Sequence, residues 1–170
     1  GEKWWYVGLR GDLAAAEGSE GRVVPGLRVL PSKSGLAGAE IELIARENRE
    51  TLVKRAVDPL REQYDFILID APPSLGLLTL NGLVAADFAI VPIQCEYFAM
   101  EGLSQIIELA RQTKARDNHK LEIGGIVLTM FDPALELAQE VANEVRGYFD
   151  GTVFDSMIPR DVHISESPSH

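Results

Sequence analysis

Short runs of consecutive apolar residues, each ended by a polar or proline-rich turn, constrain the fold of this chain most. The clearest run is residues 66–69, Phe-Ile-Leu-Ile, which stops at Asp70 and is followed by Ala-Pro-Pro. Residues 88–93 and 123–128 repeat the pattern. Because such runs are apolar on both sides, they are typical of strands buried on both faces of a parallel sheet.

Amphipathic segments alternate with these strands. Apolar residues recur at helical spacing over 39–60, 103–110 and 138–149, with charged residues between them. Shorter strands are predicted at 27–31 and 153–158. Strands that alternate with helices predict right-handed crossovers. The expected fold is therefore α/β, a mainly parallel sheet flanked by helices on both faces in three layers.

Residues 1–26 are poorly determined by their sequence, which is rich in Gly and Glu and has weak periodicity. Trp4, Trp5 and Tyr6 form an aromatic cluster that fits either a short helix or a packed tail. A length of 170 residues with 46% hydrophobic content fits one globular domain. We expect a single, partial domain over residues 1–170.

The formal net charge of −10 excludes attraction of DNA or anionic lipid by bulk electrostatics, so any nucleic-acid contact needs a local basic patch. The one cysteine, Cys95, cannot form an intramolecular disulfide, which suits a reducing cytosol. A small strand-end residue is a better interpretation of it than a reactive thiol. No apolar run approaches the roughly 20 residues of a membrane helix, and the start is not a signal peptide. We expect a soluble, cytoplasmic protein without membrane contact.

Polar residues follow the predicted strands at Asp70, 94–96, 129–132 and 159–161. Because ligands of parallel sheets bind outside the carboxyl ends of the strands, these residues should share one rim. Asp70 suits a carboxylate that orients a water of a magnesium ion on nucleotide phosphates. A helix N-cap or turn residue is the alternative role for it.

The turn after Asp70 is rigid by composition. Pro72 and Pro73 fix φ and remove two backbone donors, so Ser74 and Gly76 emerge at a defined place. Rigid turns beside phosphate sites can report which phosphate is present.

Residues 64–81, which contain this turn, resemble the Walker B and switch II segment of ParA/Soj partition ATPases. Residues 91–103, 125–132 and 158–170 resemble three further signatures of that family, in the family's order. Together the matches cover roughly residues 27–170. The family belongs to the deviant Walker A group of P-loop NTPases, whose fold is the Rossmann-like α/β sheet expected above.

The resemblance implies that Asp70 acts on Mg²⁺ through water and that the switch II turn responds to the γ-phosphate of ATP. The switch II residues are Ala71, Pro72, Pro73, Ser74 and Gly76. It further implies an adenine pocket lined by Thr129, Met130, Pro159, Arg160 and Asp161. A flat base needs an apolar slot with a few polar partners, which Met130 and Pro159 suit. Without the family, ordinary packing at strand ends is the alternative for these two residues.

The function that the resemblance implies is an ATP-dependent partition protein that acts as a nucleotide-switched homodimer in chromosome or plasmid segregation. Its cofactors would be ATP and Mg²⁺, and its partner a ParB/Spo0J-like protein. The protein would be cytoplasmic or associated with the nucleoid. A MinD-like positioning ATPase is one alternative, and a non-enzymatic protein-interaction module that has lost the phosphate loop is another.

The family's glycine-rich Walker A loop is absent from the sequence. Residues 21–26 have the right glycine interval, but Leu27 and Arg28 stand where Lys and Ser/Thr should follow, and Pro25 removes a donor. We therefore expect the N-terminal strand and the P-loop to be missing, and catalytic residues stay unknown. Such a chain would be a fragment that hydrolyses ATP poorly. The neighbours of a lost central strand would recruit another strand.

DNA contact is weakened by Ala134 and His163, which stand in neighbourhoods where the family carries basic residues. A basic stretch between residues 111 and 120 could substitute for them, since each neutralised phosphate releases counterions. It consists of Arg111, Lys114, Arg116, His119 and Lys120. A solvated helix end, where cations are favourable, is the alternative interpretation.

Overall fold

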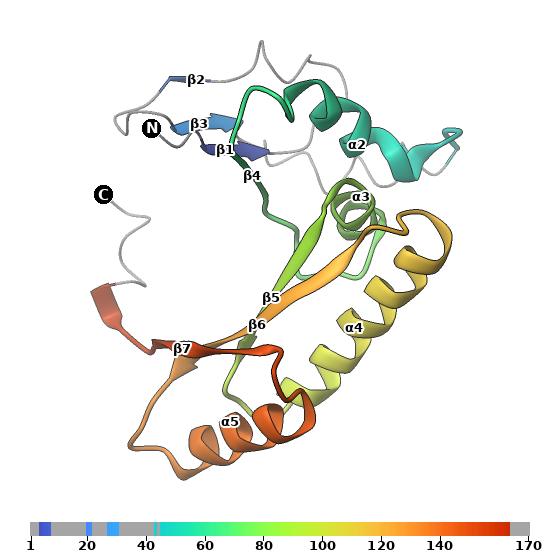
Figure 1. Cartoon of the computed structure of the whole chain (residues 1–170). Coiled ribbons are helices and arrows are strands. Elements are labelled where there is room, and N and C mark those ends of the chain that lie inside the picture. Colours follow the sequence, from blue (N-terminus) through green and yellow to red (C-terminus); the bar gives the residue numbers. More distant parts are fainter. Residues whose placement is uncertain (1–3, 8–19, 22–26, 31–42, 44, 164–170) are drawn as a thin grey trace. The chain divides into compact units, whose positions relative to one another are not determined.

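The structure is a computed structural model that describes residues 4–7, 20–21, 27–30, 43 and 45–163 (Figure 1). These residues fall into two compact units, which we describe separately. The first takes the chain up to Asp87 together with 113–121, and the second takes 88–112 and the residues from 122 on. The expected single domain over 1–170 stays a prediction.

The first unit contains a four-stranded sheet in the order β2-β3-β1-β4. The strands are β1 (Trp4–Val7), β2 (Glu20–Gly21), β3 (Leu27–Leu30) and β4 (Phe66–Ile69). Strand β1 pairs in parallel with both β3 and β4, and β2 is antiparallel to β3. The predictions for β3 and β4 are confirmed.

Residues 4–6 lie in a strand, so the expectation of a short helix or a packed tail is wrong. Aromatic residues fit the pleated surface of a sheet well, and a run of three of them was a strand signal that we missed. Because β1 lies between β3 and β4, it supplies the backbone partners that those strands need on their facing edges.

The continuous helix expected over 39–60 is wrong for the described part of that range. Asn48 has a left-handed backbone with φ 55°, which separates the residues before it from those after it. A 3₁₀ turn η1 (Arg49–Thr51), the helix α2 (Leu52–Val57) and a second 3₁₀ turn η2 (Asp58–Leu60) come next. Pro59 has no N–H to continue the helix, which explains why α2 stops there. Residues 39–42 and 44 lie outside the described part, as does Pro31 at the end of the strand predicted over 27–31.

A small core joins α2 to β4 in the first unit. Buried Val53, Val57 and Leu60 pack with Ala85 and contact the inner side of β4 through Ile67 and Ile69. On the other side of β4, Phe66 and Leu68 are 47% and 50% exposed. The prediction that this strand is buried on both sides is therefore wrong, because described helices cover one side of it. Ala85 ends α3 (Leu77–Ala85), a helix that is not among those predicted from the apolar spacing.

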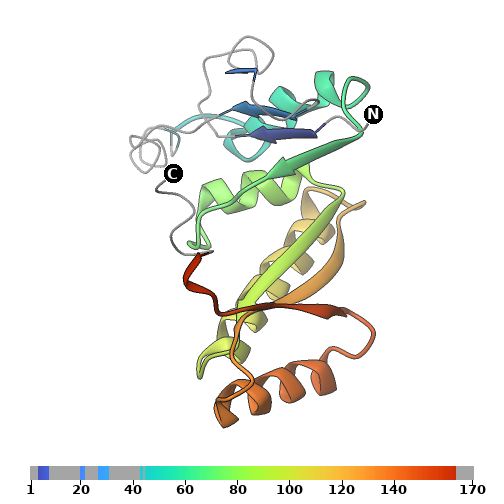
Figure 2. The same ribbon diagram turned by 90° about the vertical axis from the view of Figure 1, so that its left-hand side faces the viewer.

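The second unit contains a parallel three-stranded sheet in the order β5-β6-β7. Its strands are β5 (Phe88–Gln94), β6 (Glu122–Phe131) and β7 (Val153–Pro159), and its helices are α4 (Ala99–Arg116) and α5 (Glu136–Tyr148). All five elements were predicted, and the parallel sheet flanked by helices is confirmed. Helices α4 and α5 lie on the same side of the sheet (Figure 1), and Figure 2 looks onto the strands with α4 behind them.

The face toward α4 and α5 forms the larger core. Leu103, Ile126, Leu128 and Val145 are fully buried there, because every second residue of a strand and one stripe of each helix point inward. The opposite face exposes large apolar side chains, namely Phe88, Ile90, Phe154 and Ile158. Burial on both sides of 88–93 is thus also a wrong prediction.

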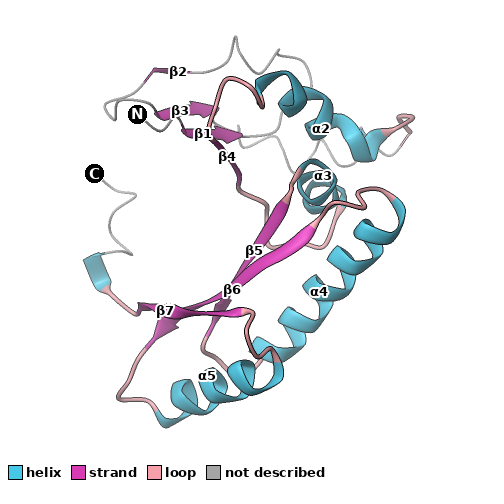
Figure 3. Ribbon diagram, viewed as in Figure 1, coloured by secondary structure: helices cyan, strands magenta, loops and turns pink. Residues whose placement is uncertain are grey.

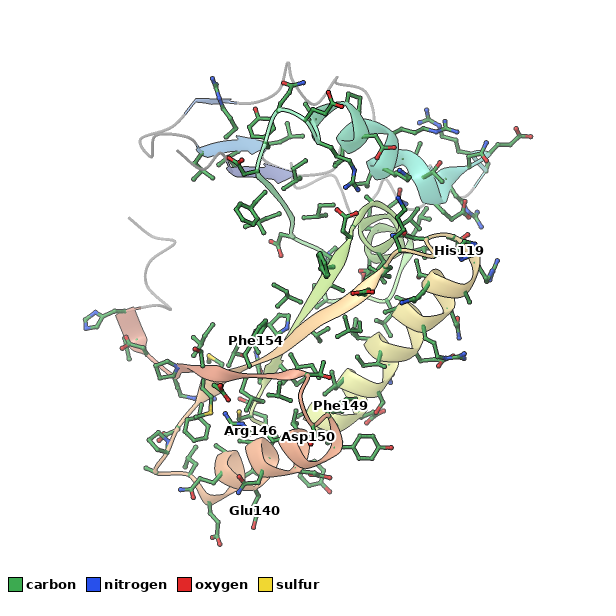
Figure 4. All side chains as sticks on the ribbon, viewed as in Figure 1. His119, Glu140, Arg146, Phe149, Asp150 and Phe154 are labelled. Atoms are coloured by element: carbon green, nitrogen blue, oxygen red, sulfur yellow. The ribbon has the colours of Figure 1, made fainter. Side chains whose placement is uncertain are left out.

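Phe154, which is labelled on β7 in Figure 4, packs over Gly125 of the neighbouring strand β6. Gly125 has φ 157°, and a Cβ built there would lie 2.5 Å from the Phe154 ring. A side chain at position 125 would therefore displace the ring, which makes glycine a packing requirement of this strand pair.

Truncation at the centre of the larger core tests this packing. Leu103→Ala should lower the free energy of unfolding by about 3 kcal/mol, since it removes buried methyl groups and leaves a cavity. Leu137→Ala, at a site that is 45% exposed, should cost less than about 1 kcal/mol. Urea unfolding followed by circular dichroism measures both, and equal costs would contradict the core assignment.

Candidate functional site

The carboxyl ends of β5, β6 and β7 bring three of the predicted polar segments to one rim of the second unit. Gln94 is in register with Thr129, and Phe131 is in register with Pro159. The polar segments at these strand ends, 94–96, 129–132 and 159–161, are therefore neighbours. For these three segments the predicted shared rim is confirmed.

Hydrogen bonds fix the rim. The Cys95 N–H donates to the Thr129 carbonyl at 3.1 Å, and the Arg160 N–H donates to the Phe131 carbonyl at 2.9 Å. The Thr129 hydroxyl donates to the Ile93 carbonyl at 3.1 Å. This bond uses the one hydroxyl hydrogen, so the Thr129 oxygen is left to accept a bond from a ligand.

Met130 has a backbone conformation that side-chain-bearing residues rarely adopt. Its φ of 53° is left-handed, and among the described non-glycine residues only Asn48 shares that feature. A Cβ in this region costs roughly 1–2 kcal/mol. Residues with a strained backbone cluster at ligand sites. The end of β6 is therefore the part of the rim where the backbone most clearly indicates a binding site.

An ion pair joins the loop after β5 to the end of β7. The Arg160 guanidinium donates to Glu96 Oε1 at 2.8 Å, with the side chains 48% and 54% exposed. Tyr97 and Phe98 come directly after Glu96, 77% and 72% exposed, with edge-to-face rings whose centroids lie 5.1 Å apart. Sequence reasoning placed Glu96 on the rim but missed it as the partner of Arg160, because no local pattern relates two residues so far apart in the chain.

The predicted metal and switch residues belong to the first unit. Asp70 directly follows β4 and is exposed, and residues 71–76 form the loop that leads into α3 (Figure 3). Gly76 is the N-cap of α3, and its carbonyl accepts the Leu80 N–H at 3.1 Å. Whether Asp70 shares the rim of β5, β6 and β7 stays a prediction.

No group of three or more His, Cys, Asp or Glu side chains that could hold a metal ion occurs within the described ranges. Asp70 nevertheless fits Mg²⁺, which keeps several waters and often takes only one or two protein carboxylates beside substrate phosphates. The part of the chain that the structure describes contains no helix with the length and apolarity needed to cross a membrane.

The basic stretch around the end of α4 is partly neutralised. Arg111 donates from Nε and Nη2 to the Glu108 carboxylate, both at 2.8 Å. These hydrogen bonds from Arg111 lower the pKa of Glu108 to about 2. His119, in the turn after α4 (Figure 4), lies 2.8 Å through Nδ1 from the Lys114 carbonyl. His119 and His163 are both exposed, and His170 lies outside the described residues.

Comparison with known proteins identifies one matching family model and several relatives that are named as chromosome partitioning proteins. A family described as an AAA domain matches residues 10–123. The chain is 50% identical over 143 residues to the chromosome partitioning protein ParA of Myxococcus xanthus, covering 84% of this chain and 50% of that protein. It is 47% identical over 147 residues to the chromosome-partitioning ATPase Soj of Treponema pallidum, covering 86% and 58%. It thus spans about half the length of these relatives.

A solved structure resembles the fold closely. It is that of cobyrinic acid a,c-diamide synthase from Mycobacterium smegmatis with bound ADP and magnesium. The superposition has a TM-score of 0.79 at 36% sequence identity, and it covers 89% of this chain and 61% of that one.

Glycine at position 130 tests the strain at the rim. Met130→Gly should keep or raise the thermal midpoint, because glycine adopts a left-handed φ without a steric cost, whereas Met130→Ile should lower it by several degrees. Differential scanning fluorimetry measures both. A loss of stability in Met130→Gly as large as in Met130→Ile would contradict the strain.

Thiol chemistry tests the interpretation of Cys95 as a packing residue. Cys95 is 4% exposed, and burial raises the pKa of its thiol, so less thiolate is present at any given pH. Alkylation by iodoacetamide at pH 8 should therefore be slower in the folded chain than in urea, because the folded chain both covers the sulfur and holds less of it as thiolate. Equal rates would identify a reactive thiol.

Proposed function

The chain belongs to the ParA/Soj family of partition ATPases, and we propose on that premise that it forms part of an ATP-dependent nucleotide switch. The observation that carries the proposal is the rim of the second unit. There Thr129, Met130 and 159–161 converge on neighbouring strand ends, with a strained backbone at Met130.

In this proposal the rim binds the adenine base. Met130 and Pro159 offer apolar surface to the flat ring, and backbone groups beside them reach its polar edge. The Thr129 oxygen accepts a hydrogen bond, and Arg160 is held in place by Glu96. Asp161 completes the set, and its Oδ1 already accepts the His163 N–H at 2.7 Å, which fixes the carboxylate.

Asp70 would hold Mg²⁺ through water, as the Walker B carboxylate. When bound, the ion would supply positive charge that offsets the charge of the nucleotide phosphates. The exposed Asp70 carboxylate directly follows β4 and offers the oxygen ligands that Mg²⁺ prefers. The Ala-Pro-Pro segment after it restricts the backbone, because the two prolines fix φ. Residues 71–76 would respond to the presence of the γ-phosphate.

At the level of the whole protein, we propose an ATPase of chromosome or plasmid partition. Two copies would dimerise with ATP bound, slow hydrolysis would reset them, and a ParB-like protein would stimulate turnover. The setting would be the cytoplasm. These statements rest on relatives of which this chain spans 50% and 58%.

Contact with DNA is a secondary part of the proposal. The net charge is −10, and Arg111 is already paired with Glu108, so fewer cations remain in the basic stretch than the sequence suggests. Any affinity for DNA should therefore be weak and fall steeply with salt.

Nucleotide titration of this chain tests the proposed site, with Asp65 as the matched control for Asp70. Both aspartates flank β4, one at each end. Binding of ATP should be weak, with a Kd of about 1 mM, since the base slot acts without a Walker A loop. Magnesium should tighten binding at least threefold, or about 0.7 kcal/mol. Asp70→Asn should abolish that gain, and Asp65→Asn should retain it.

The readout is saturation-transfer NMR on ATP with and without Mg²⁺. If ATP does not bind, with or without Mg²⁺, a protein-interaction module on the same fold becomes the better interpretation. If both variants lose the magnesium effect equally, the assignment of Asp70 is wrong.

A further inference from the structure

Helix α3 carries two buried polar side chains that the nucleotide site does not use. Thr79 is 5% exposed and Asn81 is 1% exposed. Because a buried polar group costs free energy unless it is hydrogen-bonded, the partners of these two residues show what they do.

Thr79 holds the turn that follows Asp70. Its hydroxyl lies 3.2 Å from the Pro72 carbonyl and 2.5 Å from the Ser74 carbonyl. The two carbonyls share the one hydroxyl hydrogen. Neither Pro72 nor Pro73 has an N–H, so the turn has few donors of its own for these oxygens. Thr79 therefore fastens the turn to the first part of α3.

Asn81 holds a different segment, at residues 49–53. Its Oδ1 accepts the Val53 N–H at 3.2 Å, and its Nδ2 donates to the carbonyls of Arg49 and Leu77 at 2.8 and 2.9 Å. The N-cap residue of α2, Thr51, makes no side-chain cap bond. Asn81 thus satisfies an N–H at the start of α2 that the cap leaves open.

The far end of α3 is closed as well. Asn118 donates from Nδ2 to the carbonyls of Leu83 and Ala86, at 3.0 and 2.7 Å. Nearby, Arg61 donates to the Ala85 carbonyl and to Asp87, both at 2.6 Å. Asn118 and Arg61 thus bond carbonyls that the end of a helix leaves without partners. Because its last turn is held in this way, α3 should move as one unit when the turn before it moves.

We propose that α3 is a relay between the turn at 71–76 and the segment at 49–53, with Thr79 as the positioning residue at the turn and Asn81 at the segment. In this relay, loosening the turn loosens the segment at 49–53, and loosening the segment loosens the turn, because a coupling free energy between two sites acts equally in both directions. The link to nucleotide rests on the proposed function, in which the turn responds to the γ-phosphate.

Amide hydrogen exchange on the chain without nucleotide tests the relay. Thr79→Val removes the hydroxyl and keeps the shape, and it should speed exchange at residues 74–76 and at the Val53 N–H by roughly three- to tenfold, the effect of one hydrogen bond. Thr79→Ser, which keeps the hydroxyl, should restore slow exchange at both places. Thr113→Val is the matched control, because Thr113 is another buried threonine, 1% exposed, and it should change neither.

Asn81→Asp tests the reverse direction. It keeps an oxygen for Val53 and loses the amide donors to Arg49 and Leu77, so exchange should rise at 49–53 and also at 74–76. If Thr79→Val affects residues 74–76 alone, the relay is wrong. If it behaves like Thr113→Val, the positioning role is wrong too. A failed ATP titration would leave these results unchanged, which separates this proposal from the proposed function.

Discussion

Parallel pairing of β5, β6 and β7 is the constraint on which the candidate site depends. It places the ends of three strands side by side, so that residues 94–96, 129–132 and 159–161 meet although they lie far apart in the chain. The backbone bonds from Cys95 to Thr129 and from Arg160 to Phe131 extend that pairing beyond the strands. Met130, with its left-handed backbone, lies between these hydrogen-bonded strand ends. Such a strained conformation persists only where the surrounding structure holds it in place.

In the first unit, side chains hold the turn at residues 71–76, in which two prolines lack a backbone donor. Two prolines make the loop after β4 stiff and remove two of its backbone donors. The Thr79 side chain of α3 donates to two carbonyls of this loop, and α3 is in turn tied to η1 and α2 through Asn81 and to the loop around Asn118. Buried polar residues here organise the backbone rather than line a pocket, which explains why Thr79 and Asn81 stand in an otherwise apolar helix.

Most of the second unit could be predicted from sequence because its elements are long and strongly periodic. The stripe from Leu103 to Ala110 and the strand at 123–128 each carry enough apolar positions to fix both type and place. The first unit was harder. Four-residue strands such as β1 give little periodicity, and the break at Asn48 is a single backbone angle that a helical pattern does not reveal. Burial of Phe66 and Phe88 was overestimated, because an apolar run does not state whether a helix covers each face. The Arg160 to Glu96 pair and the bonds of Asn81 link distant segments, so no local pattern predicts them.

The central claim is that the rim formed by β5, β6 and β7 takes an adenine nucleotide. A map of amide chemical-shift changes in the isotope-labelled chain, as AMP and then Mg·ATP are added, tests it most directly. AMP should shift the amide signals of Thr129, Met130 and Arg160, and Mg·ATP should add shifts at Asp70 and Ser74. Shifts scattered over the exposed apolar face around Phe88 and Ile90, with the rim unchanged, would contradict it.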